Sequence, residues 1–183
     1  MKHQRKRLYL RVTVKLMFLG LVLALGITLL RSIPATRDNA GLMRYDLTSL
    51  RTGEMVKLEW GKRRVLLLRR ETSDVDLTKI DDHLLDPNSR HATQPEFAET
   101  PWRSLSREYF IALDYGTDLN CELEYVATHE QSKAPAPWLG GFRDRCRGSW
   151  YDLAGRVYRE QHALRNLSVP QYRIEDGQLL LGE

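Results

Sequence analysis

An apolar run directly behind a basic segment constrains this chain more than any other feature. Residues 16–30 read LMFLGLVLALGITLL and contain no charged side chain. These 15 positions are fewer than the about 20 residues that a helix needs to cross a bilayer core. Residues 12–15 extend the run to 19, because Lys15 can extend its ammonium group to the lipid headgroups, and 19 residues suffice for a tilted helix. The run therefore predicts one transmembrane helix with its core at 16–30.

The distribution of charge predicts the orientation of that helix. Residues 1–15 contain six Lys or Arg and no acid, so the rest of the chain has 22 basic against 24 acidic residues. The net charge of +4 and the pI of about 9.1 thus reflect the N-terminal segment. A basic folded surface, as nucleic-acid-binding domains have, is excluded on this balance. The positive-inside rule predicts that 1–15 is cytoplasmic and that residues 31–183 lie outside.

A cleaved signal peptide is the alternative to an uncleaved anchor, with a buried core helix as the third reading. Signal cleavage requires small residues at positions −1 and −3 of the cut, and residues 33–35 (IPA) match this poorly. We therefore favour the anchor. Residues 31–41 are polar and contain Pro34, so we expect a tether there, with an extracytoplasmic domain over 42–183.

The part of the chain after the tether has the pattern of a mainly β protein. Residues 54–60 and 63–70 are strand-like and flank a turn at Gly61 and Lys62, which predicts a hairpin. Residues 109–115 (YFIALDY) give the clearest single strand. Further short strands are expected at 149–157, 168–174 and 178–181, a short helix or turn at 75–85, and loops at 88–101 and 134–141. Such elements favour an antiparallel sandwich or barrel.

The counts of metal-ligating residues leave a small metal site open. Two Cys and five His would suffice for a Cys2His2 site, although not for a site with three thiolates. Their spacing does not favour one, because His129 lies eight residues beyond Cys121 and His162 sixteen beyond Cys146. We expect each His to be an exposed or turn residue. Phosphate-binding loops and the hydrolase motifs His-Glu-x-x-His and Gly-x-Ser-x-Gly are absent from the sequence.

The C-terminal half contains an extended family motif. Residues 144–157 (DRCRGSWYDLAGRV) resemble the second cluster-binding box of Rieske proteins, Cys-Pro-Cys-His-Gly-Ser-x-Tyr/Phe-Asp followed by Gly-Arg-Val. Residues 166–172 (NLSVPQY) and 181–182 are similar to the strands that follow it. Upstream, 46–50, 56–57 and 63–70 resemble the opening strands, and 85–89 with 94–95 the middle loop. Together with the order of anchor, tether and head, the chain resembles the Rieske iron–sulfur subunit of cytochrome bc complexes, which implies a Rieske-like antiparallel β head.

The departures from this family lie at the cluster ligands. The family's first box reads Cys-Thr-His-Leu-Gly-Cys, and residues 116–121 read GTDLNC. In both boxes of the family the first Cys and the His bind iron, and the remaining Cys residues form a disulfide. By position, the four ligand sites are taken here by Gly116, Asp118, Asp144 and Arg147. The resemblance further implies that Cys121 and Cys146 are the surviving disulfide pair, which an extracytoplasmic location also favours.

These substitutions remove the chemistry of a Rieske centre. Such a centre needs two thiolates and two imidazoles, whereas glycine has no ligand atom and a guanidinium cannot donate to a metal. We therefore expect no cofactor, no metal and no catalytic residue, and an ion pair of Arg147 with either Asp118 or Asp144. Ser149 and Tyr151 stand where the family's hydrogen-bond donors to the cluster stand. Residues 159–163 (REQHA) replace the family's proline-rich lid.

Three functions follow from this reading. The favoured one is a cluster-free structural or accessory subunit of a cytochrome bc-type respiratory assembly, with cytochrome b and cytochrome c subunits as partners by resemblance. The alternative is the family's usual role, electron transfer through a 2Fe–2S cluster within ubiquinol–cytochrome c reductase. The third is a binding module that uses Asp118, Asp144 and Arg147. In each case we expect a single-pass protein of a bacterial inner membrane with a periplasmic head and no contact with nucleic acid.

Overall fold

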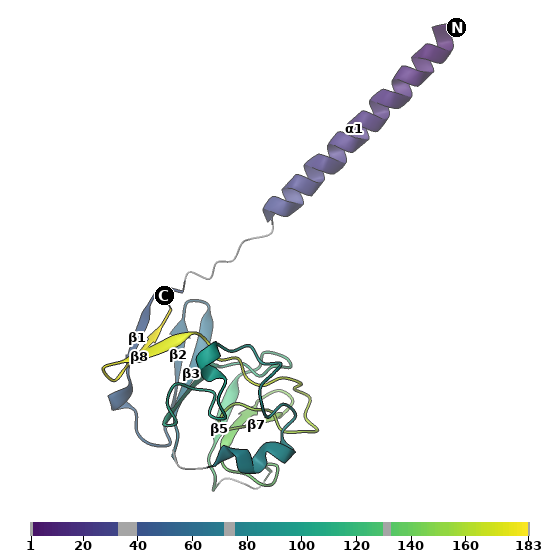
Figure 1. Cartoon of the computed structure of the whole chain (residues 1–183). Coiled ribbons are helices and arrows are strands. Elements are labelled where there is room, and N and C mark those ends of the chain that lie inside the picture. Colours follow the sequence, from purple (N-terminus) through teal and green to yellow (C-terminus); the bar gives the residue numbers. More distant parts are fainter. Residues whose placement is uncertain (1, 33–39, 72–75, 130–132, 183) are drawn as a thin grey trace. The chain divides into compact units, whose positions relative to one another are not determined.

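The computed structural model describes residues 2–32, 40–71, 76–129 and 133–182. The chain divides into two compact units, 1–38 and 39–183, which are considered separately. The first unit consists of a helix, and the second, called the head below, holds the β-sheets (Figure 1).

The helix α1 spans Lys2–Ser32. Its large apolar side chains are exposed, from 49% at Val12 to 71% at Met17. The segment Arg11–Thr28 has a mean hydropathy of 1.8 and none of it is buried against protein. Because an apolar helix without protein cover matches a lipid environment, a single anchor helix is confirmed as predicted. The expected tether at 31–41 lies mostly outside the described residues.

The head consists of three antiparallel sheets of three strands each, with strand orders β1-β9-β8, β2-β3-β4 and β5-β6-β7. In Figure 1, β1, β8, β2 and β3 gather at the end of the head where the C-terminus lies, and β5 and β7 at the other end. The strands are β1 (Met43–Asp46), β2 (Met55–Trp60), β3 (Arg63–Arg69), β4 (Tyr109–Leu113), β5 (Leu123–Val126), β6 (Gly141–Asp144), β7 (Trp150–Asp152), β8 (Tyr172–Glu175) and β9 (Gln178–Leu181). The prediction of a mainly β head is confirmed.

The β2–β3 hairpin forms as predicted. Trp60 pairs with Arg63 across the two-residue turn, and Gly61 adopts a φ of +61°, a left-handed conformation that glycine tolerates without steric cost. The centre of β3, residues 65–68, is wholly buried. The continuous apolar run at 65–68 therefore becomes the middle strand of its sheet, between β2 and β4.

Two predicted strands end or begin differently. The strand expected at 149–157 stops at Asp152, because the Asp152 carboxylate accepts hydrogen bonds from the N–H groups of Ala154 at 3.0 Å and Arg156 at 2.7 Å and turns the chain. The strand expected at 168–174 starts only at Tyr172, after Pro170.

The segment 46–50, which resembled an opening strand, is instead largely a 3-10 helix over Leu47–Ser49. Its N-cap, Asp46, accepts a hydrogen bond from the N–H of Thr48. The Asp46 side chain thus satisfies the Thr48 N–H, which in a strand would have needed a carbonyl on a neighbouring strand. A second 3-10 helix, Leu77–His83, lies within the helix or turn predicted at 75–85, and a third, Glu96–Ala98, lies within the loop predicted at 88–101.

One hydrophobic core joins all three sheets. It includes the centres of β3 and β4, Phe142 of β6, Tyr151 of β7 and Leu179 of β9. A smaller cluster of Ile80, Leu84, Trp138 and Tyr158 packs beside it. Because the β5-β6-β7 sheet shares the main core, its connecting loops are held against the rest of the head rather than forming a separate module.

Candidate functional site

The first box loop, residues 116–121, connects β4 to β5. Its ends are tied by two backbone hydrogen bonds, from the Gly116 N–H to the Cys121 carbonyl at 2.8 Å and from the Asn120 N–H to the Gly116 carbonyl at 3.1 Å. Asn120 adopts a φ of +54°, a conformation in which Asn is enriched. The loop is thus a compact turn and not an open strap.

The second box loop, residues 144–149, connects β6 to β7. Asp144 organises it: its Oδ1 accepts hydrogen bonds from the N–H groups of Cys146 at 2.8 Å and Arg147 at 2.9 Å, and its carbonyl accepts from Gly148. Asp144 itself is almost fully buried. The aspartate expected at a family ligand position therefore works here as the side chain that shapes the loop.

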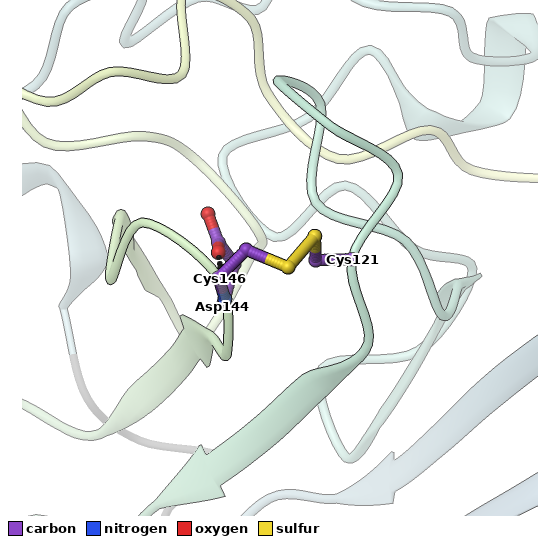
Figure 2. Close-up of side chains that lie close together, drawn as sticks. All are labelled: Cys121, Asp144 and Cys146. Atoms are coloured by element: carbon purple, nitrogen blue, oxygen red, sulfur yellow. Dashed lines mark hydrogen bonds between the residues drawn. A yellow bond between two sulfur atoms is a disulfide. The ribbon is translucent and has the colours of Figure 1, made fainter.

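A disulfide between Cys121 and Cys146 joins the two loops, with the Cα atoms 5.9 Å apart. Figure 2 shows the bond running from the first box loop to the second, with the Asp144 side chain on the other side of Cys146. The predicted disulfide is confirmed. No free cysteine is found in the described part of the chain.

The four positions expected to correspond to iron ligands lie together in two pairs. A Cβ atom on Gly116 would lie 2.9 Å from the Asp144 Cβ, so these two residues are in direct contact. The Arg147 guanidinium lies 3.3 Å from the Asp118 carboxylate. Of the two ion pairs considered for Arg147, the structure thus has the one with Asp118. Arg147 is half exposed, so this pair contributes at most about 1 kcal/mol to stability.

Tyr151, on β7 just after the second box loop, connects that loop to the first one. Its hydroxyl accepts a hydrogen bond from the Thr117 N–H at 3.0 Å and lies 3.2 Å from the Thr117 hydroxyl. The ring is fully buried, and burial raises the pKa of the Tyr151 hydroxyl. Tyr151 therefore stays neutral at physiological pH and serves as both a core residue and a cross-link.

Ser149 reaches a third loop, residues 159–163. Its hydroxyl accepts a hydrogen bond from the Ala163 N–H at 3.1 Å, and both residues are buried. Two residues further along, the carbonyl of Arg165 accepts a hydrogen bond from the Thr117 hydroxyl. The segment 159–163, expected at the place of the family's lid, is therefore bonded to the second box loop, and Arg165 just after it is bonded to the first.

Buried arginines hold the turn after the second box, and nothing in the sequence pattern pointed to two of them. Arg103 is 1% exposed and donates hydrogen bonds to the carbonyls of Ala154 at 3.0 Å and Leu167 at 2.7 Å. Burial lowers the pKa of Arg103 to about 10, which still leaves it charged at neutral pH. Arg70 is likewise buried and donates to the Leu153 carbonyl. A single buried Arg leaves no repeating pattern in the sequence, so its burial can be recognised only in the folded structure.

Arg156, the third buried arginine, belongs to the Gly-Arg-Val element that the sequence did show. Its guanidinium lies 2.8 Å from Asp152 and 2.8 Å from Asp81. Two carboxylates offset the cost of burying this charge, and the network links the turn to the 3-10 helix Leu77–His83.

A metal site is not formed by the thiols in this state. In the described part of the chain, one group of three candidate ligands lies together, Cys121, Asp144 and Cys146, and both cysteines are consumed by the disulfide. The described histidine side chains are exposed, namely His83, His91, His129 and His162.

Comparison with known proteins identifies relatives over most of the chain, although no family model matches it. The ubiquinol-cytochrome c reductase iron-sulfur subunit of Allochromatium vinosum is 31% identical over 140 residues, which cover 75% of this chain and 68% of that protein. The mitochondrial cytochrome b-c1 complex subunit Rieske-4 of Nicotiana tabacum is 30% identical over 176 residues, 92% of this chain and 65% of the relative.

One more sequence relative and one solved structure also match the chain. The mitochondrial subunit Rieske-1 of Arabidopsis thaliana is 30% identical over 166 residues, and the chain spans 53% of its length. A chain of a structure titled hyperthermophilic respiratory Complex III aligns with 91% of this chain and 98% of its own length, at 16% identity and a TM-score of 0.45. On the sequence relatives, this chain belongs to the family of Rieske iron–sulfur subunits of ubiquinol–cytochrome c reductase.

Proposed function

We propose that this protein is a cluster-free member of its family, a membrane-anchored structural or accessory subunit of a cytochrome bc-type respiratory assembly. The observation that carries the proposal is the identity of the residues at the four ligand positions, Gly116, Asp118, Asp144 and Arg147. They take the places of two thiolates and two imidazoles, and Ser149 and Tyr151 remain beside them as parts of the scaffold.

The residues at this site do not fit a 2Fe–2S cluster. Gly116 offers no ligand atom and Arg147 no lone pair, and the two cysteines nearby are bonded to each other. The two loops also stand close together in this chain: a Cβ on Gly116 would be 2.9 Å from the Asp144 Cβ, so the loops would have to move apart before side chains at these positions could hold a metal between them. The loops are instead joined by the disulfide and by the pair of Arg147 with Asp118.

Family membership by itself favours a second candidate, the electron-transfer subunit of ubiquinol–cytochrome c reductase, since that is what the relatives' names describe. Iron and acid-labile sulfide analysis, with electron paramagnetic resonance of the reduced protein, separates the two. We expect the full chain purified in detergent to contain neither element and to give no signal. A rhombic iron–sulfur signal would establish the second candidate and end the first, along with a binding module at the vacated site.

A rebuilt ligand set is the matched positive control for that measurement. The variant G116C/D118H/D144C/R147H restores the family's residues at all four positions and leaves the disulfide pair in place. We expect it to retain iron after reconstitution under conditions in which the wild-type chain retains none. Equal iron in the two proteins would contradict the assignment of these positions.

The proposed membrane arrangement follows the charge pattern. Residues 1–15 lie in the cytoplasm, 16–30 cross a bacterial inner membrane, 31–41 form the tether, and 42–183 form the periplasmic head. Protease added to the outside of spheroplasts is expected to release a head-sized fragment. Protection of the head from external protease would mean that the head lies in the cytoplasm, opposite to the proposed orientation.

The proposed partners are the cytochrome b and cytochrome c subunits of the assembly, which the relatives' names suggest. The box loops and 159–163 form the end of the head that we propose for docking. Hydrogen bonds join the box loops to 159–163 and to Arg165 just after it, and two apolar side chains are exposed there, Leu119 in the first box loop and Leu164 directly after 159–163. Affinity purification from detergent-solubilised membranes should recover cytochrome b with this chain. A preparation that lacks both cytochromes would refute this partnership.

A further inference from the structure

A cavity of about 230 Å³ lies beside the first box loop, on the side that faces residues 165–168. It is smaller than the pockets that hold drug-sized ligands. Its lining comes from segments far apart in the sequence and combines polar and apolar surface in similar amounts. The polar side chains used below are those of Thr93, Tyr115, Asn120, Arg165 and Ser168.

The walls of this cavity are fixed to one another by hydrogen bonds. At the end of β4, the Leu113 N–H donates to the Ser168 carbonyl at 2.8 Å, and the Thr117 hydroxyl donates to the Arg165 carbonyl. Asn166, between them, is buried, and both ends of its side-chain amide are hydrogen-bonded within the fold. A ligand would therefore enter a preformed site and would not have to order its walls.

The charge of the cavity is positive. Arg165 lines it, and no carboxylate does. Arginines of the second box strand and loop are neutralised locally, Arg143 by Glu124 at 3.3 Å and Arg147 by Asp118 at 3.3 Å. The exposed guanidinium of Arg165, in contrast, has no acidic partner in the described part of the chain. An anionic ligand would supply the partner that the Arg165 guanidinium lacks.

Uncharged groups on the other walls provide further hydrogen bonds. The Tyr115 hydroxyl accepts the N–H of Arg64 at 2.9 Å, so its own proton points elsewhere and is free to be donated. The side chains of Asn120 and Ser168 likewise have no protein partner in the described residues. One guanidinium with hydroxyl and amide groups around it matches a small organic acid that also bears a hydroxyl group.

We propose that this cavity binds a small hydroxycarboxylate, with the carboxylate on Arg165 in a two-pronged ion pair and the hydroxyl group on the side of Asn120, Ser168 and Tyr115. The cavity adjoins the end of the head proposed for docking, since Gly116, Thr117 and Asn120 of the first box loop line it, but binding of a small acid does not require a partner subunit. A molecule of about six non-hydrogen atoms in a surface cavity should bind with a dissociation constant on the order of 1 mM.

Lactate is the probe, titrated into the full chain in detergent micelles and followed by calorimetry or by NMR shifts. Lactamide, which has the same shape without the charge, should bind at least about tenfold more weakly, since hydrogen bonds between two charged groups are stronger than those to a neutral amide. The variant Arg165→Gln should lose a similar factor, while Arg44→Gln, an exposed arginine on β1, should not. Lactate binding that is absent, equal to that of lactamide, or unchanged in Arg165→Gln would overturn the proposal.

Discussion

Removing the disulfide is the change whose effect can be worked out most directly. In the variant C121S/C146S, the other ties between the box loops stay in place, namely the hydrogen bonds of Tyr151 and Thr117 and the ion pair of Arg147. The native loops should therefore keep their shape. The loss falls mainly on the unfolded chain, which gains freedom over a loop with a sequence separation of 25.

The chain-entropy relation gives a magnitude for this loss. A closed loop of this length corresponds to about 3.5 kcal/mol at 25 °C. For a head of this size, that free energy lowers the melting temperature by about 10 °C. Since the estimate contains only loop length, it predicts nearly the same decrease for the serine variant and for the wild-type chain after reduction.

Thermal unfolding of the full chain in detergent, followed by circular dichroism, measures the effect. Wild type, reduced wild type and C121S/C146S are compared, and a reductant added to the serine variant serves as the control that should change nothing. If the melting temperature of C121S/C146S lay within about 2 °C of wild type, the disulfide would not stabilise the head by restricting the unfolded chain, and the chain-entropy estimate would be wrong. A variant that does not fold would show that the hydrogen bonds around Tyr151 cannot hold the loops alone.

Three further predictions concern the same end of the head and its core. The double variant D118N/R147Q should lose less than about 1 kcal/mol, and the loss should disappear at high salt, because Arg147 is half exposed; a loss that persists in salt would contradict this. Tyr151→Phe should cost about 1 kcal/mol in chemical denaturation, because the partly buried Thr117 N–H loses its acceptor, and an unchanged midpoint would argue against that bond. Burial raises the pKa of Tyr172 to about 12, above the value of about 10 in an unfolded chain, so stability is fully present below pH 10 and lost as pH rises from about 10 towards 12. The melting temperature should fall across that window and fall less in Tyr172→Phe.

The features that could be predicted from the sequence depend on local patterns. The hairpin of β2 and β3 follows from two strand-like runs around Gly61, and the disulfide follows from the two box motifs that contain Cys121 and Cys146. Side-chain competition with the backbone was not anticipated: Asp152 ends β7 by accepting two backbone N–H groups, although the residues after it have strand-like composition.

Other features are non-local and left no trace in the pattern. Strands β5 and β6 were not predicted, because polar residues such as Glu124 and Arg143 pair across them and break the apolar alternation. Arg103 lies in a stretch for which no element was predicted, and only the assembled fold brings it to the carbonyls of Ala154 and Leu167. The cavity beside Arg165 is likewise built from segments that the sequence keeps far apart.

The carbonyl-binding role of Arg103 has a consequence for how such a protein can evolve. Arg103 and Asp152 fix the turn at Gly155 through bonds that do not involve positions 116, 118, 144 or 147. The frame behind the two box loops, meaning the turn at Gly155 and the residues that hold it, is thus stabilised by contacts other than those of the four positions. Exchanges at the four positions therefore leave the turn at Gly155 in place, and what they must preserve locally is the second box loop, which the Asp144 carboxylate shapes. A lineage can thus pass from a redox protein to an inert one or to a new binder without rebuilding the frame.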